Sequence, residues 1–265
     1  GIQEELCSIL KCSNIVKKSK GTKKKLSKVI EDSQLIRCIL SSIFNYNKFS
    51  NDDINNWNAY HYCKYLGVNV CPYCNRIYTH TIMNKDENII RPSLDHYIPQ
   101  SRYPLFGLSF FNLIPSCTYC NSSIKNDKDD FTLEHKVFDN YLHPYFDDGK
   151  FSFQFKPFDI NGFNGKKDKI KIEIINEENK KVKNSLVFFK VADIYQVHND
   201  IVASLISKRI KYNDESLKMI GKLIKVEKEE LFKIAFDTIE EEDIIDYSLG
   251  KLKRDITNQL KKLTL

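Results

Sequence analysis

The stretch LDHYIPQSRYP (residues 94–104) places an Asp-His pair shortly before a proline, about midway between CPYC (residues 71–74) and CTYCN (residues 117–121). A hydrophobic core does not require three motifs of polar and cysteine residues at such regular spacing. We therefore expect them to form the two halves of one site, and we expect that site to decide the fold of the middle of the chain.

The two Cys-x-x-Cys pairs have the spacing of metal ligands. Two thiolates two residues apart can bind one ion, and a second pair completes the tetrahedral shell of structural zinc. The pairs are separated by 42 residues, a longer gap than in a small zinc ribbon, so the segment between them must itself fold. The prediction is a zinc site made by Cys71, Cys74, Cys117 and Cys120.

Two other interpretations of these cysteines stay open. CPYC also occurs in glutaredoxin-like redox sites, where the first cysteine is activated at a helix N-terminus after a strand. Here it follows a stretch expected to be helical (residues 55–67) and is matched by a second pair, which favours zinc. The third interpretation is coincidental core cysteines, which is also our expectation for the four remaining thiols, Cys7, Cys12, Cys38 and Cys63.

The composition indicates a globular protein without a membrane span. The chain has 265 residues, of which 42 % are hydrophobic, enough for one large domain or two modest ones. No stretch approaches 18 consecutive apolar residues, and the N-terminus lacks the order of a secretory signal. We expect a soluble cytoplasmic protein, in which eight cysteines argue against a disulfide framework.

The net charge of +6 is a local feature. Residues 1–50 hold ten Lys/Arg against four Asp/Glu, which leaves the remainder balanced. The densest part, KKSKGTKKKLSK (residues 17–28), would attract phosphate, although a solvated helix face has the same composition. Nucleic-acid contact there is one of two open interpretations.

Periodicity predicts an α+β protein in three regions. Residues 1–66 form a basic helical region, with helices expected over 2–48 and 52–65; residues 67–146 hold the site and a hairpin around NKDE (residues 84–87). Residues 147–265 begin with two strands, 151–155 and 169–175, and end in helices. The apolar faces expected there are Ile194, Val197, Ile201 and Leu205, then Leu252, Ile256, Leu260 and Leu263.

Taken in order, CPYC, SLDHYIPQS (residues 93–101) and FNLIPSCTYCNSSIK (residues 111–125) resemble an HNH endonuclease of the ββα-metal type, in the variant braced by two Cys-x-x-Cys zinc pairs. The resemblance covers about residues 68–126. It implies an HNH nuclease core with a four-cysteine zinc site, flanked by helical N- and C-terminal regions. It also implies that this core hydrolyses phosphodiester bonds, preferably of DNA, with RNA or tRNA as possible substrates.

The resemblance assigns roles residue by residue. His96 matches the general base that activates water, and Asp95 the carboxylate that holds the catalytic divalent ion. Asn112 matches the asparagine that braces the loop and the histidine. Asn121 stands where the second metal ligand is often His.

The chemistry of cleavage needs these residue types. A phosphodiester repels hydroxide, so cleavage requires a cation and a base. Carboxylate and amide oxygens suit Mg²⁺ or Mn²⁺, and His titrates near neutral pH. If residues 117–125 open a helix, Asn121 and Lys125 share one face, so we expect Lys125 to contact the nucleic acid, with Arg102 as a second contact. Adjacent strand residues point to opposite faces, so Asp95 and His96 can serve one phosphate only if the strand ends or twists there.

The size and the flanking helices resemble the nuclease subunit of prokaryotic anti-phage systems, of the Septu (PtuB-like) or retron type. This resemblance implies an ATPase partner of the SMC or ABC type. The chain has no Walker A sequence, so any ATP dependence would have to come from a partner. The alternatives are a stand-alone restriction enzyme and a non-catalytic, zinc-braced nucleic-acid binding module. For His143, in YLHPYFDD (residues 141–148), a packed turn is favoured over a catalytic role.

Overall fold

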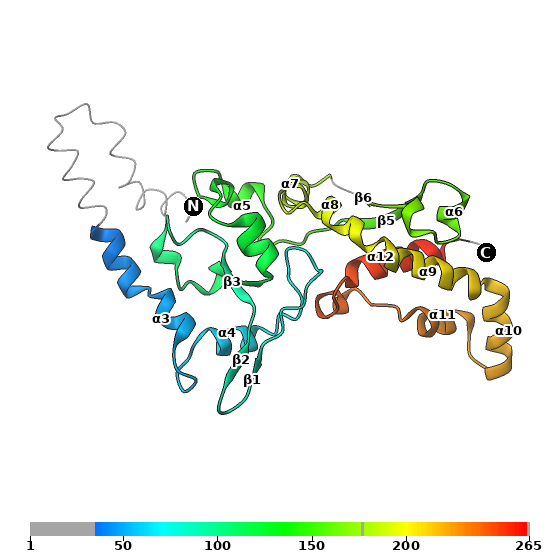
Figure 1. Ribbon diagram of the computed structural model, residues 1–265, viewed down its shortest axis with the longest axis horizontal. Helices are drawn as coiled ribbons and strands as arrows, with labels where there is room; N and C mark the ends of the chain where they lie inside the picture. The colour runs from blue at the N-terminus through cyan, green and yellow to red at the C-terminus, as the bar shows by residue number, and fades with distance from the viewer. Residues whose placement is uncertain (1–34, 176–177, 264–265) are drawn as a thin grey trace.

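The computed structural model describes residues 35–175 and 178–263, arranged as Figure 1 shows. Within these residues, helices and three two-stranded antiparallel sheets form a mixed α+β structure, which agrees with the predicted class. The predictions for residues 1–34, including the basic stretch 17–28 and the thiols of Cys7 and Cys12, lie outside the described residues.

A strand pair carries the Asp-His motif. β3 (Ser93–His96) pairs in antiparallel register with β4 (Leu113–Ser116), and Asp95 and His96 are its last two residues. The chain leaves the strand after His96, before Ile98-Pro99. The regular alternation of side chains therefore stops where the motif ends.

The helix η5 (Tyr119–Lys125) follows β4, so the order is strand, strand, helix. The backbone N–H of Asn126 donates to the carbonyl of Asn121 at 2.7 Å, a five-residue bond that makes this a π-turn. A helix was predicted here, but with α-helical spacing. The connection between the strands contains η3 (Pro104–Phe106) and η4 (Phe110–Asn112).

Helices precede this unit. Residues 35–43 are helical, followed by α3 (Tyr46–Asn51) and α4 (Ala59–Leu66). α4 begins later than predicted because the Asn58 side chain accepts hydrogen bonds from the first N–H groups of the helix, and it ends where Gly67 adopts φ +61°. The predicted hairpin around NKDE is present as β1 (Ile82–Met83) and β2 (Asn88–Ile90).

The predicted strands of the C-terminal region are also confirmed. β5 (Ser152–Pro157) and β6 (Ile170–Ile175) form a six-residue ladder. α12 (Gly250–Lys261) covers the free edge of β5, because Asp255 and Gln259 accept hydrogen bonds from the N–H groups of Phe153 and Phe155. Side chains of a helix thus take the place of a third strand.

The other elements are short helices before β6 and a helical array after it. They are η6 (Asp129–Phe131), α5 (Val137–Asn140), α6 (Ile160–Phe163), η7 (Lys167–Lys169), α7 (Lys180–Phe188), α8 (Val191–Tyr195), η8 (Gln196–His198), α9 (Asn199–Lys211), α10 (Asp214–Ile224), α11 (Lys228–Phe236) and η9 (Glu242–Asp246).

Two predictions of burial were wrong. Val197 is 69 % exposed, and the buried face of α9 carries Val202, Ala203, Ile206 and Arg209. The 3-10 segment η8 interrupts the helix at residues 196–198, so the apolar period does not run through. Cys38 is exposed, unlike Cys63. In contrast, Leu252, Ile256 and Leu260 of α12 are buried as expected.

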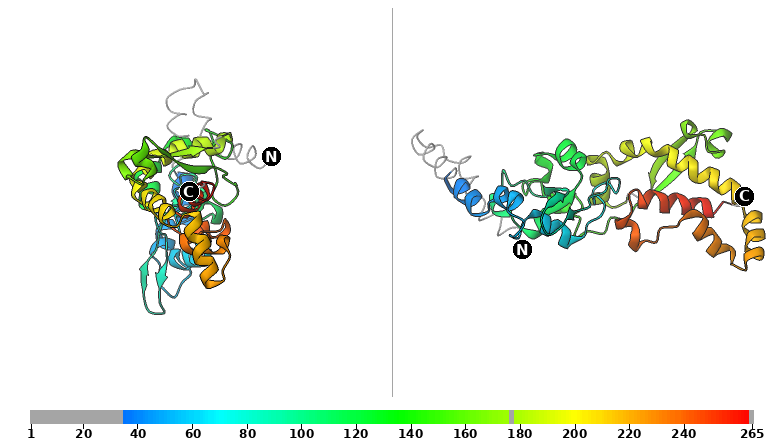
Figure 2. Two further views of the ribbon diagram at one scale, coloured as in Figure 1. Left: turned by 90° about the vertical axis from the view of Figure 1, so that its right-hand side faces the viewer. Right: turned by 60° about the horizontal axis from the view of Figure 1, so that its bottom comes forward.

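One hydrophobic core links the middle and C-terminal regions. It extends from Cys71 to Leu260, across the predicted boundary at residues 146/147. Figures 1 and 2 show the two regions side by side along the long axis, with α10 at the end opposite to residues 35–43. Among the described helices, none has the length and apolar character needed to cross a membrane.

Candidate metal centre and active site

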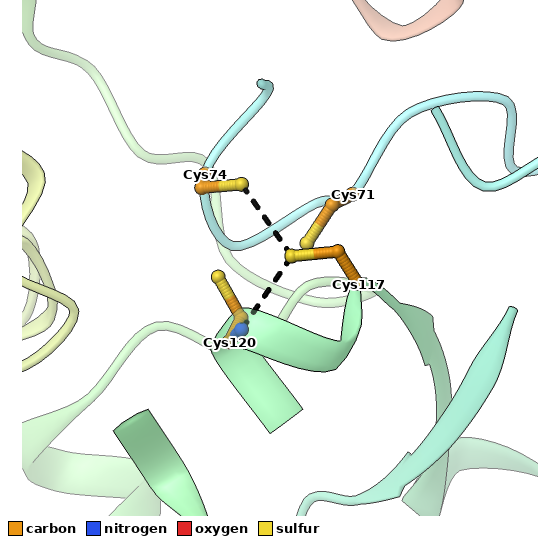
Figure 3. A group of neighbouring side chains, drawn as sticks. All are labelled: Cys71, Cys74, Cys117 and Cys120. Carbon is orange, nitrogen blue, oxygen red and sulfur yellow. Dashed lines mark hydrogen bonds between the residues drawn. The ribbon is translucent and has the colours of Figure 1, made fainter. Parts of the chain in front are cut away.

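The four cysteines of the two pairs converge. The sulfur atoms of Cys71, Cys74, Cys117 and Cys120 all lie within 4.8 Å of one another, and all four residues are buried (Figure 3). Tetrahedral zinc with bonds of about 2.3 Å separates its sulfurs by about 3.8 Å, and the Cys74 and Cys117 sulfurs lie 3.9 Å apart. The cluster therefore fits, and could hold, a metal ion such as zinc.

Backbone hydrogen bonds shape both halves of the cluster. In the first half, the N–H groups of Cys74 and Asn75 donate to the carbonyl of Cys71, and the Tyr195 hydroxyl donates to the carbonyl of Cys74 at 2.6 Å. In the second half, the N–H of Cys120 points to the Cys117 sulfur at 3.5 Å, the kind of bond that stabilises a metal thiolate. The second half opens η5, so the cluster fixes the start of that helix.

Asp95 is 3 % exposed, and each of its carboxylate oxygens has a partner. The Tyr73 hydroxyl donates to Oδ2 at 2.6 Å, and Lys125 Nζ donates to Oδ1 at 2.9 Å. Lys125 also donates to the carbonyl of His96 at 2.7 Å and lies over the Phe131 ring. Burial, and then the Asp95 charge, raise the pKa of Tyr73 well above its usual value, so Tyr73 stays a donor.

His96 is oriented by its Nε2. This nitrogen lies 3.0 Å from the carbonyl of Gly107, and a carbonyl can only accept, so Nε2 carries the proton and Nδ1 is the basic nitrogen. The Tyr46 ring packs edge-on against the imidazole. Burial lowers the pKa of His96, although the Gly107 carbonyl and Asp95 act in the opposite direction. The neutral ring can therefore accept a proton near pH 7.

Asn112 closes the loop between the strands. Its Oδ1 accepts from the N–H of Ile98 at 2.7 Å, and its Nδ2 donates to the carbonyls of Ile98 and Phe106, both at 3.0 Å. Asn112 is 5 % exposed. Its three hydrogen bonds satisfy backbone groups of a loop that has no strand pairing to satisfy them. Gly107 follows Phe106, so the same bonds hold the carbonyl that orients His96.

One polar cavity of about 440 Å³ lies at the end of β3. Asp95, His96, Asn121 and Lys125 all contribute to its wall, so the end of β3 brings both members of the Asp-His pair to one space. The other polar residues of the lining include Arg91, Gln100, Asn126 and Asp127.

Two predicted nucleic-acid contacts differ in their surroundings. Lys125 is 1 % exposed, and its amine donates to Asp95 and to the carbonyl of His96, so its contact with nucleic acid stays a prediction. The wider π-turn and the proximity of β3 place it there. Arg102 lies on the surface, paired with Asp129, and its contact with nucleic acid stays a prediction.

His143 belongs to a packed turn. Its Nδ1 accepts from the N–H of Tyr145 at 3.2 Å, so Nε2 is the nitrogen that donates to the carbonyl of Phe111 at 3.0 Å. The ring stacks on Phe146 and is 2 % exposed. Burial lowers its pKa to about 4. Both nitrogens are used structurally, in agreement with the interpretation favoured from sequence.

Three residues at the site were not predicted. Tyr73, between the first two cysteines, contacts Asp95, while Arg91 and Asp127 line the cavity. Arg91 donates to Ser50 Oγ at 2.6 Å, which holds its guanidinium at the rim. The sequence contains no signal for Arg91 or Asp127, whereas the position of Tyr73 inside CPYC could have indicated proximity to the motif.

Comparisons with protein-family models, with curated proteins and with solved structures find no match to this chain. The geometry of the site therefore carries the functional argument.

Replacing Cys120→Ser should remove most of the bound metal and lower the melting temperature, because the ion loses one of four ligands and η5 loses its anchor. Metal content by mass spectrometry and melting by circular dichroism measure both effects. Cys38→Ser, at an exposed thiol outside the cluster, should keep wild-type metal content. Equal metal in both variants would contradict the site.

Acid should destabilise the protein through His143. Its pKa is about 4 in the folded state and near the ordinary 6.5 when unfolded, so the unfolded state binds the proton more tightly. The stability contributed by the neutral ring is complete above pH 6.5 and is lost as the pH falls towards 4. Urea unfolding at pH 7.5 and 5.0 should show a smaller loss for His143→Gln than for wild type. The exposed His135→Gln should behave as wild type.

Proposed function

We propose that the protein is a metal-dependent endonuclease of the HNH type that hydrolyses phosphodiester bonds of DNA. The observation that carries the proposal is His96, whose Nε2 is held by the carbonyl of Gly107 while the ring borders a polar cavity together with Asp95 and Asn121. In the part of the chain that the structure describes, Nδ1 of His96 has no hydrogen-bond partner, and a neutral histidine of this kind beside hard oxygen ligands is what water activation at a phosphate requires.

His96 would accept, at Nδ1, the proton of the water that attacks phosphorus as the bond to the leaving oxygen breaks. Asn112 keeps the loop closed, so the Gly107 carbonyl holds the ring during this transfer. Arg91, on the cavity wall, is placed to attract the phosphate.

Two metal sites with different ligands accompany this proposal. The four buried thiols suit zinc in a structural role. Asp95 and Asn121 offer oxygen ligands of the kind that bind Mg²⁺ or Mn²⁺, and each Asp95 oxygen retains a lone pair beside its existing hydrogen bond. A divalent ion held there would neutralise charge on the phosphate and stabilise the leaving oxygen.

The broader context stays a prediction. The anti-phage role and the ATPase partner rest on the resemblance of the sequence, and the described residues do not bear on them. A restriction enzyme would use the same cavity. The non-catalytic binding module is the candidate from another class, and a cavity with a positioned neutral histidine argues against it, because binding alone does not need a base.

The test is cleavage of supercoiled plasmid by zinc-loaded protein with Mg²⁺ or Mn²⁺. We expect metal-dependent nicking that EDTA stops and that His96→Ala reduces by about 10²–10⁴-fold, the usual contribution of a general base. His80→Ala, at an exposed histidine that does not line the cavity, is the matched control and should cut as wild type.

Undiminished cleavage by His96→Ala would refute the assignment of the base. Wild-type protein that binds plasmid tightly and leaves it intact would favour the binding module instead.

A further inference from the structure

Each half of the cysteine cluster encloses, or is followed by, a residue that donates a hydrogen bond to the Asp95 carboxylate. Tyr73 lies between Cys71 and Cys74, and its hydroxyl donates to Oδ2 at 2.6 Å. Lys125 ends the helix that Cys117 and Cys120 open, and its amine donates to Oδ1 at 2.9 Å. The orientation of the carboxylate is therefore fixed from two sides by residues whose own backbone the cluster holds.

Both partners of the hydrogen bond between Tyr73 and Asp95 are held in place by their own contacts. The ring stacks on Phe189, with centroids 4.5 Å apart and planes 18° apart. Phe189 lies directly after α7, in the core shared with the C-terminal region. Asp95 has no freedom to follow a moving partner, since it lies on β3 and is also bound to Lys125.

We propose that Tyr73 is a positioning residue, which holds Asp95 in the orientation needed for a divalent cation and so couples the cysteine cluster to the cation site. This inference rests on the proposed function. Zinc binding by the cysteines does not require a hydroxyl group on the side chain at position 73. Groups that orient a metal-binding carboxylate commonly change metal affinity when they are removed.

Tyr73→Phe is the suitable variant because it keeps the ring on Phe189 and removes only the hydroxyl. Tyr141→Phe is the matched control: the Tyr141 hydroxyl also donates to a carboxylate, Asp130, at 2.9 Å, and neither residue lines the cavity. Both variants should retain one zinc per chain and the melting temperature of wild type to within a few degrees.

The experiment titrates the zinc-loaded, full-length protein with Mn²⁺ and counts free Mn²⁺ by electron paramagnetic resonance. Wild type should bind one ion in a manner that Asp95→Asn abolishes. Tyr73→Phe should bind Mn²⁺ about 10-fold or more weakly, with a lower kcat and an unchanged KM for plasmid. Tyr141→Phe should match wild type in all three quantities.

The outcomes separate the inference from the proposed function. Wild-type affinity for Mn²⁺ and wild-type kcat in Tyr73→Phe would overturn the positioning role while leaving the nuclease intact. Loss of zinc in Tyr73→Phe would also overturn it, because the hydroxyl would then serve the cysteine turn itself. Wild-type protein that neither binds Mn²⁺ through Asp95 nor cuts plasmid would instead refute the proposed function.

Discussion

Convergence of four thiols from two distant stretches is the constraint on which the rest of the structure depends. The two cysteine pairs are separated by 42 residues in sequence, and their sulfurs lie within 4.8 Å of one another. The chain between the two pairs must therefore reverse its direction and return to the cluster. The antiparallel pairing of β3 with β4 and the closure of the loop by Asn112 meet this requirement. The C-terminal region then packs around the first turn, where Asn75 accepts hydrogen bonds from the N–H groups of Leu249 and Lys251.

A buried ion pair lies next to this cluster, and its energetics explain why the pair has so many partners. Lys125 and Asp95 are 1 % and 3 % exposed, so both charges have lost their water. The free energy lost by desolvating such a pair is offset only when further hydrogen bonds satisfy both groups. Removal of one partner commonly lowers the stability of the folded state by about 3–5 kcal/mol. Tyr73, the carbonyl of His96 and the Phe131 ring supply this completion. The hydrophobic core thus contains a polar centre in which each member limits the movement of the others.

Much of the local structure could be predicted from the sequence, because it follows from short-range rules. Spacing of cysteines predicted the cluster, and alternation predicted β5 and β6. The contacts of Lys125 could not be predicted in the same way, since they depend on β3, which is 30 residues away, and on a π-turn that has no reliable sequence signal. The exposed Val197 has a similar cause: a break at η8 resets the helical period, and no Gly or Pro marks that break. Arg91 and Asp127 reach the cavity only through the tertiary fold.

Two histidines, the half-buried His96 and the buried His143, show how one residue type takes two roles in neighbouring parts of the fold. Each directs Nε2 to a backbone carbonyl, of Gly107 for His96 and of Phe111 for His143, and burial lowers the pKa of both. They differ at Nδ1. In His143 this nitrogen accepts the N–H of Tyr145, so the ring has no lone pair left for chemistry. Within the described residues, the ring of His96 has the Gly107 carbonyl as its hydrogen-bond partner, and it borders a polar cavity. Burial favours the neutral form of both rings, and of the two it is His96 that borders the polar cavity and has no hydrogen-bond partner at Nδ1 among the described residues.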